Sequence, residues 1–524
     1  MIYLALAILL APVAWWLAQD RAVWLWDQSW YGEVCSDLWF YFSHHALRPW
    51  ATAMAYEMNL KPPGVVWIGQ FFVPLRALFG SIENALLVSI LVIQALLLWT
   101  IYKIGEALKP ANPWTPFLGV IFAAATQTFV GLSHQFMVEP LQALAVAWVV
   151  LVAAKVDDWP SARILIHLAA ATLLGALAKL TTPAYCLLFY PYIAYKLFSL
   201  RSLRSLREMF SSEWSRLSSK ILILLFAIML PATALWYDLN AKAVWQHARD
   251  SASGEIALSY GFRASFAQKF LVWSGLLNQT FLSPYLAWTM ALACLVAIIY
   301  FPFPTRAALF FLSLAQIVIV LSLFSAADAV ESRYLYALIV FVSLSVTILC
   351  AGAPRNVLLF LVLAPCVAQW TFANNAALRL HAPLADPSPL LITADADATH
   401  SRELTRIVEL TSNATGRYNV VGVEEPWLNA NGASFFAAKQ RLSTGIRSFY
   451  TSLGYAEKDT AVALKRLDDL NTHYLITLDE QHQNAAPNFL NVVSLSVLKA
   501  VRQDPRYHQI DFPSTQGVLI FERQ

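Results

Sequence analysis

Long apolar stretches recur along the first 373 residues of this chain and constrain its fold more than any other feature. A stretch of about 17 to 25 apolar residues can cross a bilayer as a helix. Hydrophobic residues make up 58% of the chain and charged residues only 13%, against about 45–50% and 25% in soluble domains. We therefore predict a mainly α-helical, polytopic membrane protein. About eleven transmembrane helices are expected, at residues 1–19, 84–102, 114–132, 138–154, 162–178, 182–199, 220–237, 281–301, 307–325, 334–351 and 355–373.

Basic residues are unevenly distributed over the connections between these stretches. The connection at 200–220 is the richest, with Arg201, Arg204, Arg207, Arg216 and Lys220. Lysine and arginine mark cytoplasmic connections, so we expect a cytoplasmic N-terminus. A long first loop, residues 20–83, then faces outward, and the chain after residue 374 lies outside as well. We expect a bacterial inner membrane and a C-terminal domain in the periplasm.

The C-terminal part, residues 374–524, reads as a small α/β domain. Hydropathy falls there, and short apolar runs are typical of buried strands. The expected strands are 389–395, 418–424, 473–479 and 517–524, with helices at 401–412 and 459–470. We see no phosphate-binding glycine loop, catalytic triad order or metal cluster in it. A structural or acceptor-docking role is therefore the simpler interpretation.

Several classes of site have no support in the sequence. A net charge of +3 does not indicate nucleic-acid binding. The five cysteines are scattered without CxxC spacing, so neither a zinc site nor a disulfide framework is indicated. His44, His45 and His134 lack a third ligand at useful spacing, which leaves a divalent metal unsupported.

Two carboxylates are candidates for acid–base chemistry. Asp27 follows the first apolar stretch, and the rings of Trp24, Trp26 and Trp30 exclude water from it, which makes a carboxylate a stronger base. Glu139 precedes Pro140 at the expected outward start of a helix. The predicted topology puts both on the same face of the membrane. The simpler alternatives are a solvated residue at the membrane boundary and a helix-terminal acid.

Three basic residues are candidates for binding a phosphate. Lys61 precedes Pro62 and Pro63, which hold the backbone extended and fix where the lysine points. Arg333 begins a late apolar stretch, and a guanidinium can grip a phosphate through two hydrogen bonds. Lys179 is a weaker candidate of the same kind. The alternatives are a lysine that snorkels to the lipid interface and an ion pair between Arg333 and Glu331.

Together these residues resemble the GT-C superfamily of membrane glycosyltransferases, in particular its protein mannosyltransferase and lipid A aminoarabinose transferase branch. The resemblance covers about the first 370 residues. Its motifs are Asp27 followed by Tyr31, the Lys61-Pro62-Pro63 run, Glu139-Pro140 and Arg333-Tyr334. Gln28 stands where many relatives have a second acid, and Trp30 stands where the aminoarabinose branch has arginine. The C-terminal part also differs from the β-trefoil of eukaryotic protein mannosyltransferases.

The resemblance implies an inverting transfer of a sugar from a polyprenyl-phosphate donor to a hydroxyl or phosphate acceptor on a glycan, lipid or protein. Asp27 would be the general base and Glu139 would orient the acceptor, while Lys61, Arg333, Tyr31 and Lys179 would hold the donor phosphate. The alternatives are a transporter or flippase of lipid-linked glycans, a lipid-linked polymerase or ligase, and a noncatalytic scaffold. A transporter is expected to have charged or broken helices at mid-membrane depth, whereas the charges here cluster in loops and at the predicted outward ends of the helices.

Overall fold

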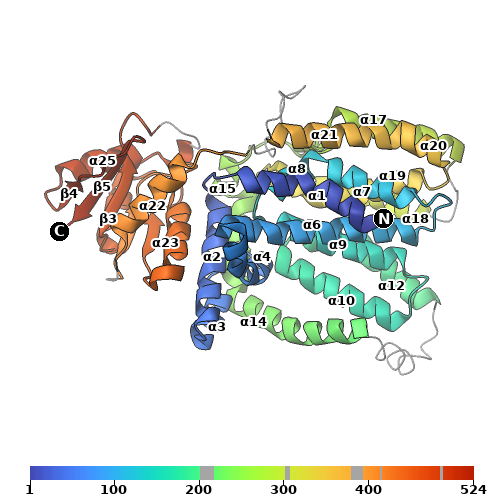
Figure 1. Ribbon diagram of the computed structural model, residues 1–524, viewed down its shortest axis with the longest axis horizontal. Helices are drawn as coiled ribbons and strands as arrows, with labels where there is room; N and C mark the ends of the chain where they lie inside the picture. Colours follow the sequence, from blue (N-terminus) through green and yellow to red (C-terminus); the bar gives the residue numbers. More distant parts are fainter. Residues whose placement is uncertain (201–216, 301–306, 379–393, 414–415, 484–487) are drawn as a thin grey trace. The chain divides into compact units, whose positions relative to one another are not determined.

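The structure, a computed structural model, describes residues 1–200, 217–300, 307–378, 394–413, 416–483 and 488–524 (Figure 1). The chain divides into two compact units. The membrane unit contains Met1–Ala18, Met58–Val65 and Leu87–Thr393. The α/β unit contains Gln19–Glu57, Val66–Leu86 and Ala394–Gln524. Most of the segment 20–83, which is predicted to face outward, therefore groups with the C-terminal residues. The expected boundary at residues 373–374 stays a prediction.

Helices make up the membrane unit, as its apolar composition predicts, because a backbone in lipid must satisfy its own hydrogen bonds. They are α1 (Ile2–Gln19), α6 (Ile82–Ala107), α7 (Thr115–Ala125), α8 (Gln127–Ser133), α9 (Glu139–Ala154), α10 (Ser161–Ala178), α11 (Thr182–Tyr185), α12 (Phe189–Leu200), α14 (Leu217–Ser253), α15 (Glu255–Ser259), α16 (Phe266–Leu276), η3 (Leu277–Leu282), α17 (Ser283–Tyr300), α18 (Ala307–Ser325), η4 (Ser332–Leu338), α19 (Ile339–Leu349), α20 (Arg355–Val357), η5 (Leu358–Leu363) and α21 (Ala364–Leu378).

Eight helices in the described part of the chain are long and apolar enough to cross a membrane. A ninth is counted if α7 and α8, which bend by 64° at Thr126, form one span. Helix is present in each of the eleven predicted stretches, but α9 is short and the stretch 182–199 is divided between α11 and α12. Four of the five basic residues in the 200–220 connection, Arg201, Arg204, Arg207 and Arg216, lie outside the described residues.

The helix α9 forms the buried centre of the membrane unit. It packs against α10, α12, α19 and η4. Almost all of its residues, from Glu139 to Ala153, are buried. A helix that is apolar on every side is buried in this way. The carboxylate of Glu139 stands at its first position, so a charged group is held at the protein-covered end of this central helix.

The α/β unit contains a five-stranded sheet in its described residues, in the order β2-β1-β3-β5-β4. The strands β1, β2 and β3 run parallel, whereas β5 is antiparallel to β3 and β4. The strands are β1 (Tyr418–Val421), β2 (Phe449–Ser452), β3 (Tyr474–Leu478), β4 (Tyr507–Ile510) and β5 (Val518–Arg523). The helices and turns with them are α22 (Thr399–Thr411), α23 (Ala430–Thr444), α24 (Thr460–Asp469), η6 (Asn488–Leu490) and α25 (Ser494–Gln503).

Both faces of this sheet are covered. On one face Leu475 and Phe521 join a core with apolar residues of α24 and α25. Successive strand residues point to opposite faces, and the alternate residues Ile476 and Ile520 are fully buried as well. The helix α23 packs on β1 and β2, with α22 beside it. The small α/β domain that the sequence predicts is present, and the predicted strand at 389–395 lies mainly outside the described residues.

Much of the segment 20–83 is helical, although the sequence predicts a loop there. It forms α2 (Trp26–Ser43), α3 (Leu47–Tyr56), α4 (Gly64–Gly69), η1 (Gln70–Leu75) and α5 (Arg76–Phe79). The helix α2 packs along α23. At Gly32 a Cβ atom would come within 2.8 Å of the ring of Phe435, so glycine permits the close approach of the two helices. The α/β unit therefore adds α2 as a further layer outside α23.

Candidate functional site

A charged cluster surrounds the buried carboxylate of Glu139 at the start of α9. Lys179 donates a hydrogen bond to Glu139 at 2.8 Å, and the Arg333 Nε lies 3.9 Å from the same carboxylate oxygen. Only 2% of the Glu139 side chain is exposed. These three predicted site residues, separated by 40 and 194 positions, come together. Arg333 also donates to Glu331, so we define the Glu139 cluster as Glu139, Lys179, Glu331 and Arg333.

Local sequence explains how Glu139 and Lys179 reach this place. Glu139 begins α9 with Pro140 next to it, where the missing N–H of proline costs nothing and the helix dipole favours a negative charge. The helix α10 ends at Ala178, and Lys179 is extended. The backbone N–H of Lys179 donates to the carbonyl of Gly175, and that of Thr182 donates to the carbonyl of Lys179. The Thr182 hydroxyl lies within hydrogen-bond distance of the same two carbonyls. Both charged side chains thus stand at helix ends, Glu139 at the start of α9 and Lys179 just after α10.

Aromatic rings form one wall of the Glu139 cluster. The Lys179 ammonium lies 4.2 Å from the centre of the Tyr334 ring, a cation–π distance. The Arg333 guanidinium lies 5.7 Å from the same ring. Tyr185 donates to the backbone carbonyl of Tyr334 and fixes its position. Cations held against a ring and a carboxylate in a water-poor site are suited to binding an anion or stabilising developing negative charge.

The turn that contains Lys61 belongs to the membrane unit and packs near this cluster. Lys61, Pro62 and Pro63 are not helical, as the two prolines predict. At the following Gly64 a Cβ atom would lie 2.6 Å from the carbonyl oxygen of Leu177, at the end of α10, and 3.0 Å from Leu141 in the first turn of α9. Only glycine allows this approach. The turn is therefore held against the two helix ends that carry Lys179 and Glu139.

Asp27 and Tyr31 lie in the α/β unit, one turn apart on α2. Asp27 occupies the first turn of the helix and is half-buried, whereas Tyr31 is 1% exposed. Acidic residues stabilise the first turn of a helix through the helix dipole. The roles expected for these two residues, as general base and phosphate ligand, stay predictions.

Metal ligands do not gather in the part of the chain that the structure describes. No group of three or more histidine, cysteine, aspartate or glutamate side chains is placed to hold an ion there. His134 instead stacks on Trp16, with ring centres 4.2 Å apart.

A second charged cluster, in the α/β unit, is not anticipated by the sequence analysis. Asp37 of α2 accepts a hydrogen bond from Arg441 of α23 at 2.7 Å, and both side chains are less than 8% exposed. Arg447 lies 3.5 Å from Asp37 and donates to Glu57 at 3.1 Å. The Arg441 guanidinium also lies 4.2 Å from the Phe40 ring centre. The pair spans 404 positions, so no local pattern reveals it.

Three glutamates of the α/β unit have raised pKa values. Burial, followed by the nearby Asp37 carboxylate, raises the pKa of Glu57 to about 7 and holds that of Glu33 well above its usual range. Burial also raises the pKa of Glu424 to about 7, although the Trp26 indole donates to its carboxylate at 3.0 Å. These groups favour the protonated form in the folded unit.

We expect the α/β unit to lose stability as the pH rises from 5 to 8. An acid whose pKa is higher in the folded than in the unfolded state binds more protons when folded, so raising the pH between the two values favours unfolding. Unfolded glutamate titrates near pH 4.3, and Glu57 and Glu424 titrate near pH 7 when folded. The loss should therefore be complete above about pH 7.

The substitution Glu424→Gln should reduce this loss, because glutamine keeps an acceptor for the Trp26 indole but carries no charge. Thermal unfolding of the purified protein at pH 5, 6, 7 and 8 measures it. Glu409→Gln, at an exposed position, is the control and should keep the wild-type dependence. A Glu424→Gln protein with the wild-type dependence would show that this carboxyl does not contribute.

Comparison with protein-family models and with curated protein sequences gives no match to this chain. Its similarity to known proteins is therefore structural.

Several solved structures share the fold over nearly the whole chain. The structure of ArnT from Cupriavidus metallidurans bound to undecaprenyl phosphate matches with a TM-score of 0.60 and 13% identity, covering 99% of this chain and 97% of that chain. The arabinofuranosyltransferase AftD from Mycobacteria matches with a TM-score of 0.55 and 13% identity, over 99% of this chain and 40% of that one. The oligosaccharyltransferase AglB from Archaeoglobus fulgidus, in complex with an inhibitory peptide and a dolichol-phosphate, matches with a TM-score of 0.51 and 9% identity, over 99% and 74%.

All three are membrane glycosyltransferases of the GT-C superfamily. Identities this low establish the fold alone. The chain therefore has the GT-C fold, and the predicted fold class, a polytopic helix bundle with a small C-terminal α/β part, is confirmed. The eight helices of spanning length in its described residues make it an integral membrane protein.

Proposed function

We propose that this protein is an inverting glycosyltransferase that moves a sugar from a polyprenyl-phosphate donor to a hydroxyl or phosphate acceptor at the outer face of the membrane. The observation that carries the proposal is the match, over 99% of this chain, to a structure holding undecaprenyl phosphate. The half-buried basic side chains of the Glu139 cluster support it, because they fit the chemistry of a phosphate leaving group.

Lys61, Lys179 and Arg333 would bind the donor phosphate, with Tyr31 as a further ligand. Phosphate is a competent leaving group once its charge is held, so no strong general acid is required. Glu139 and Glu331 balance the charges of Lys179 and Arg333. Lys61 then supplies the additional positive charge that a phosphate needs.

Asp27 would remove the proton from the acceptor hydroxyl as its oxygen attacks the anomeric carbon. In that single displacement the bond from the anomeric carbon to the acceptor oxygen forms and the bond to the phosphate oxygen breaks. The electron pair leaves with the prenyl phosphate, and the anomeric centre is inverted. Glu139 would orient the acceptor. Its Oε2 atom is buried and has no hydrogen-bond partner among the described residues, which suits a carboxylate that receives an acceptor hydroxyl.

The proposal includes a location. The basic residues of the connections favour a cytoplasmic N-terminus, as in the inner membrane of a bacterium, with the sheet-containing C-terminal part in the periplasm. A glycan, a lipid or a protein presented on that side would be the acceptor.

Removing Lys61 or Arg333 should weaken donor binding and lower turnover together. Each charge would act on the phosphate in the ground state and in the transition state. A hydrogen bond to a charged group contributes about 1.5–3 kcal/mol, so Lys61→Ala and Arg333→Ala should each weaken prenyl-phosphate binding about tenfold or more. Purified, reconstituted protein would be tested for prenyl-phosphate binding and for transfer from a prenyl-phosphate sugar.

Lys103→Ala is the matched control, because Lys103 is exposed and pairs with Glu106 on its own helix. It should bind the donor as the wild type does. If both Lys61→Ala and Arg333→Ala keep a donor affinity and a transfer rate close to wild type, these residues are only charges at the membrane interface and do not bind the phosphate.

A further inference from the structure

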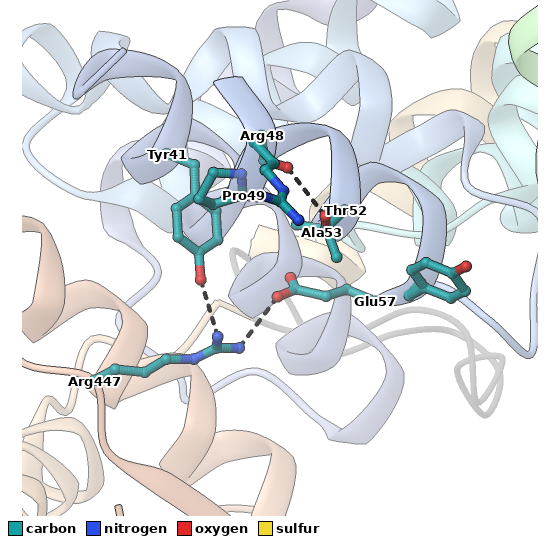
Figure 2. Close-up of a pocket in the computed structure, with 8 residues that line it drawn as sticks. Tyr41, Arg48, Pro49, Thr52, Ala53, Glu57 and Arg447 are labelled. Atoms are coloured by element: carbon teal, nitrogen blue, oxygen red, sulfur yellow. Dashed lines mark hydrogen bonds and ion pairs between the residues drawn. The ribbon is translucent and has the colours of Figure 1, made fainter. Parts of the chain in front are cut away.

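A pocket in the α/β unit is lined by none of the residues to which a role in catalysis or donor binding is given above. Its volume is about 320 Å³, at the lower end of the range for small-molecule sites. It lies between the C-terminal end of α2, the helix α3 and the loop before β2 (Figure 2). The side chains that give it chemical character are Tyr41, Arg48, Thr52, Tyr56, Glu57 and Arg447.

Arginine dominates the charge of this pocket. Arg447 is held in place, since it donates to the Tyr41 hydroxyl at 2.9 Å and to Glu57 at 3.1 Å (Figure 2). Arg48 is exposed, and no carboxylate forms a salt bridge with it in the described ranges. The lining contains two arginines and one carboxylate. Asp37 lies 3.5 Å from Arg447 as well, so Arg48 is the arginine whose charge is available to an anion.

The remaining lining favours a sugar ring. Tyr41 and Tyr56 each combine a flat apolar ring with a hydroxyl group, the amphipathic surface that suits a ring with apolar and polar faces. Tyr56 is 51% exposed, so its ring is available to a ligand. Thr52 adds a hydroxyl at the pocket wall. Guanidinium, aromatic and hydroxyl groups together fit an anionic sugar better than a simple ion.

We propose that this pocket binds an anionic sugar residue of the acceptor, away from the reacting hydroxyl. The inference rests on the proposed function. Tyr41 follows Asp27 by 14 positions on the same helix, which corresponds to about 21 Å at 1.5 Å per residue. An acceptor that reaches both points must contain several sugar units. Binding energy from a remote part of a substrate can position the reacting part.

The test uses the full-length protein in detergent, with glucuronic acid as the anionic probe and glucose as the neutral one. Saturation-transfer NMR measures their binding. Glucuronic acid should bind and glucose should not. Arg48→Gln should weaken glucuronic acid binding about tenfold or more, because it removes a charge-assisted hydrogen bond. Arg402→Gln, at another exposed arginine of the same unit, should leave binding at the wild-type level.

Equal binding of glucose, or wild-type binding by Arg48→Gln, would overturn the proposal. Binding of glycerol 3-phosphate in place of glucuronic acid would also overturn it, since the pocket would then recognise a phospholipid headgroup. Asp27→Asn separates the two proposals, because it should keep glucuronic acid binding. If Asp27→Asn transfers sugar normally while the pocket still binds glucuronic acid, the catalytic proposal fails and the binding site stands.

Discussion

Replacing Asp27 by asparagine should abolish most glycosyl transfer while folding and donor binding are preserved. Asparagine keeps the size of aspartate and much of its hydrogen bonding, so the first turn of α2 should still form. It cannot accept the proton of an acceptor hydroxyl at neutral pH. A general base contributes about 10²- to 10⁴-fold to a rate, and a loss in this range is expected. Transfer rate and prenyl-phosphate affinity of the reconstituted protein measure it.

Two other variants serve as comparisons for Asp27→Asn. Glu139→Gln should lower the rate less, because Glu139 is assigned only the orientation of the acceptor. Asp469→Asn, at an exposed position on α24, should leave the rate at its wild-type level. If Asp27→Asn turns over at a rate close to wild type, the general base lies elsewhere and Asp27 is a charge at the membrane boundary.

Breaking the buried pair between Asp37 and Arg441 should strongly destabilise the α/β unit. Both side chains are less than 8% exposed, and removing one partner of a buried ion pair costs about 3–5 kcal/mol because the other charge stays buried. Arg447, 3.5 Å from Asp37 but 39% exposed, compensates in part, so Arg441→Gln should fall at the lower end of that range. Denaturant unfolding, followed by a probe in the α/β unit, measures the change.

The double variant Asp37→Asn with Arg441→Gln should recover part of this stability, because neither charge is then left alone. Arg502→Gln is the control, since its pair with Glu480 is exposed and such pairs contribute about 1 kcal/mol or less. Additive losses in the double variant would mean that the two residues stabilise the unit independently of each other.

The membrane helices could be predicted from the sequence because a bilayer permits few alternatives. A run of apolar residues in lipid must be helical to satisfy its backbone, so composition alone locates α6, α10 and α18. Breaks between helices depend on smaller effects. At Thr126 the side chain accepts a hydrogen bond from the backbone N–H of Phe129, and α8 starts there in a new direction. A single threonine in the sequence is not enough to predict such a cap.

The residues of the two charged clusters also differ in how well the sequence predicts them. Glu139, Lys179 and Arg333 could each be selected because a charge at the end of an apolar run is unusual and costly. Their pairing could not be predicted, because hydropathy does not say which helix ends are neighbours. Asp37 lies within an ordinary mixed sequence of aromatic and polar residues, and its partner Arg441 lies in a different helix 404 positions later. Only tertiary structure reveals such a contact.

The grouping of α2 with α23 has a consequence for biosynthesis. A ribosome makes about 5–20 residues per second, and 404 positions separate Asp37 from Arg441, so the aspartate is made about 20 to 80 seconds before its partner. Throughout that interval α2 lacks the surface against which Gly32 and Asp37 pack. The nascent protein therefore completes the packing of α2 only after α23 has been made, and a ribosome that stops before α23 releases a chain in which α2 has no partner helix.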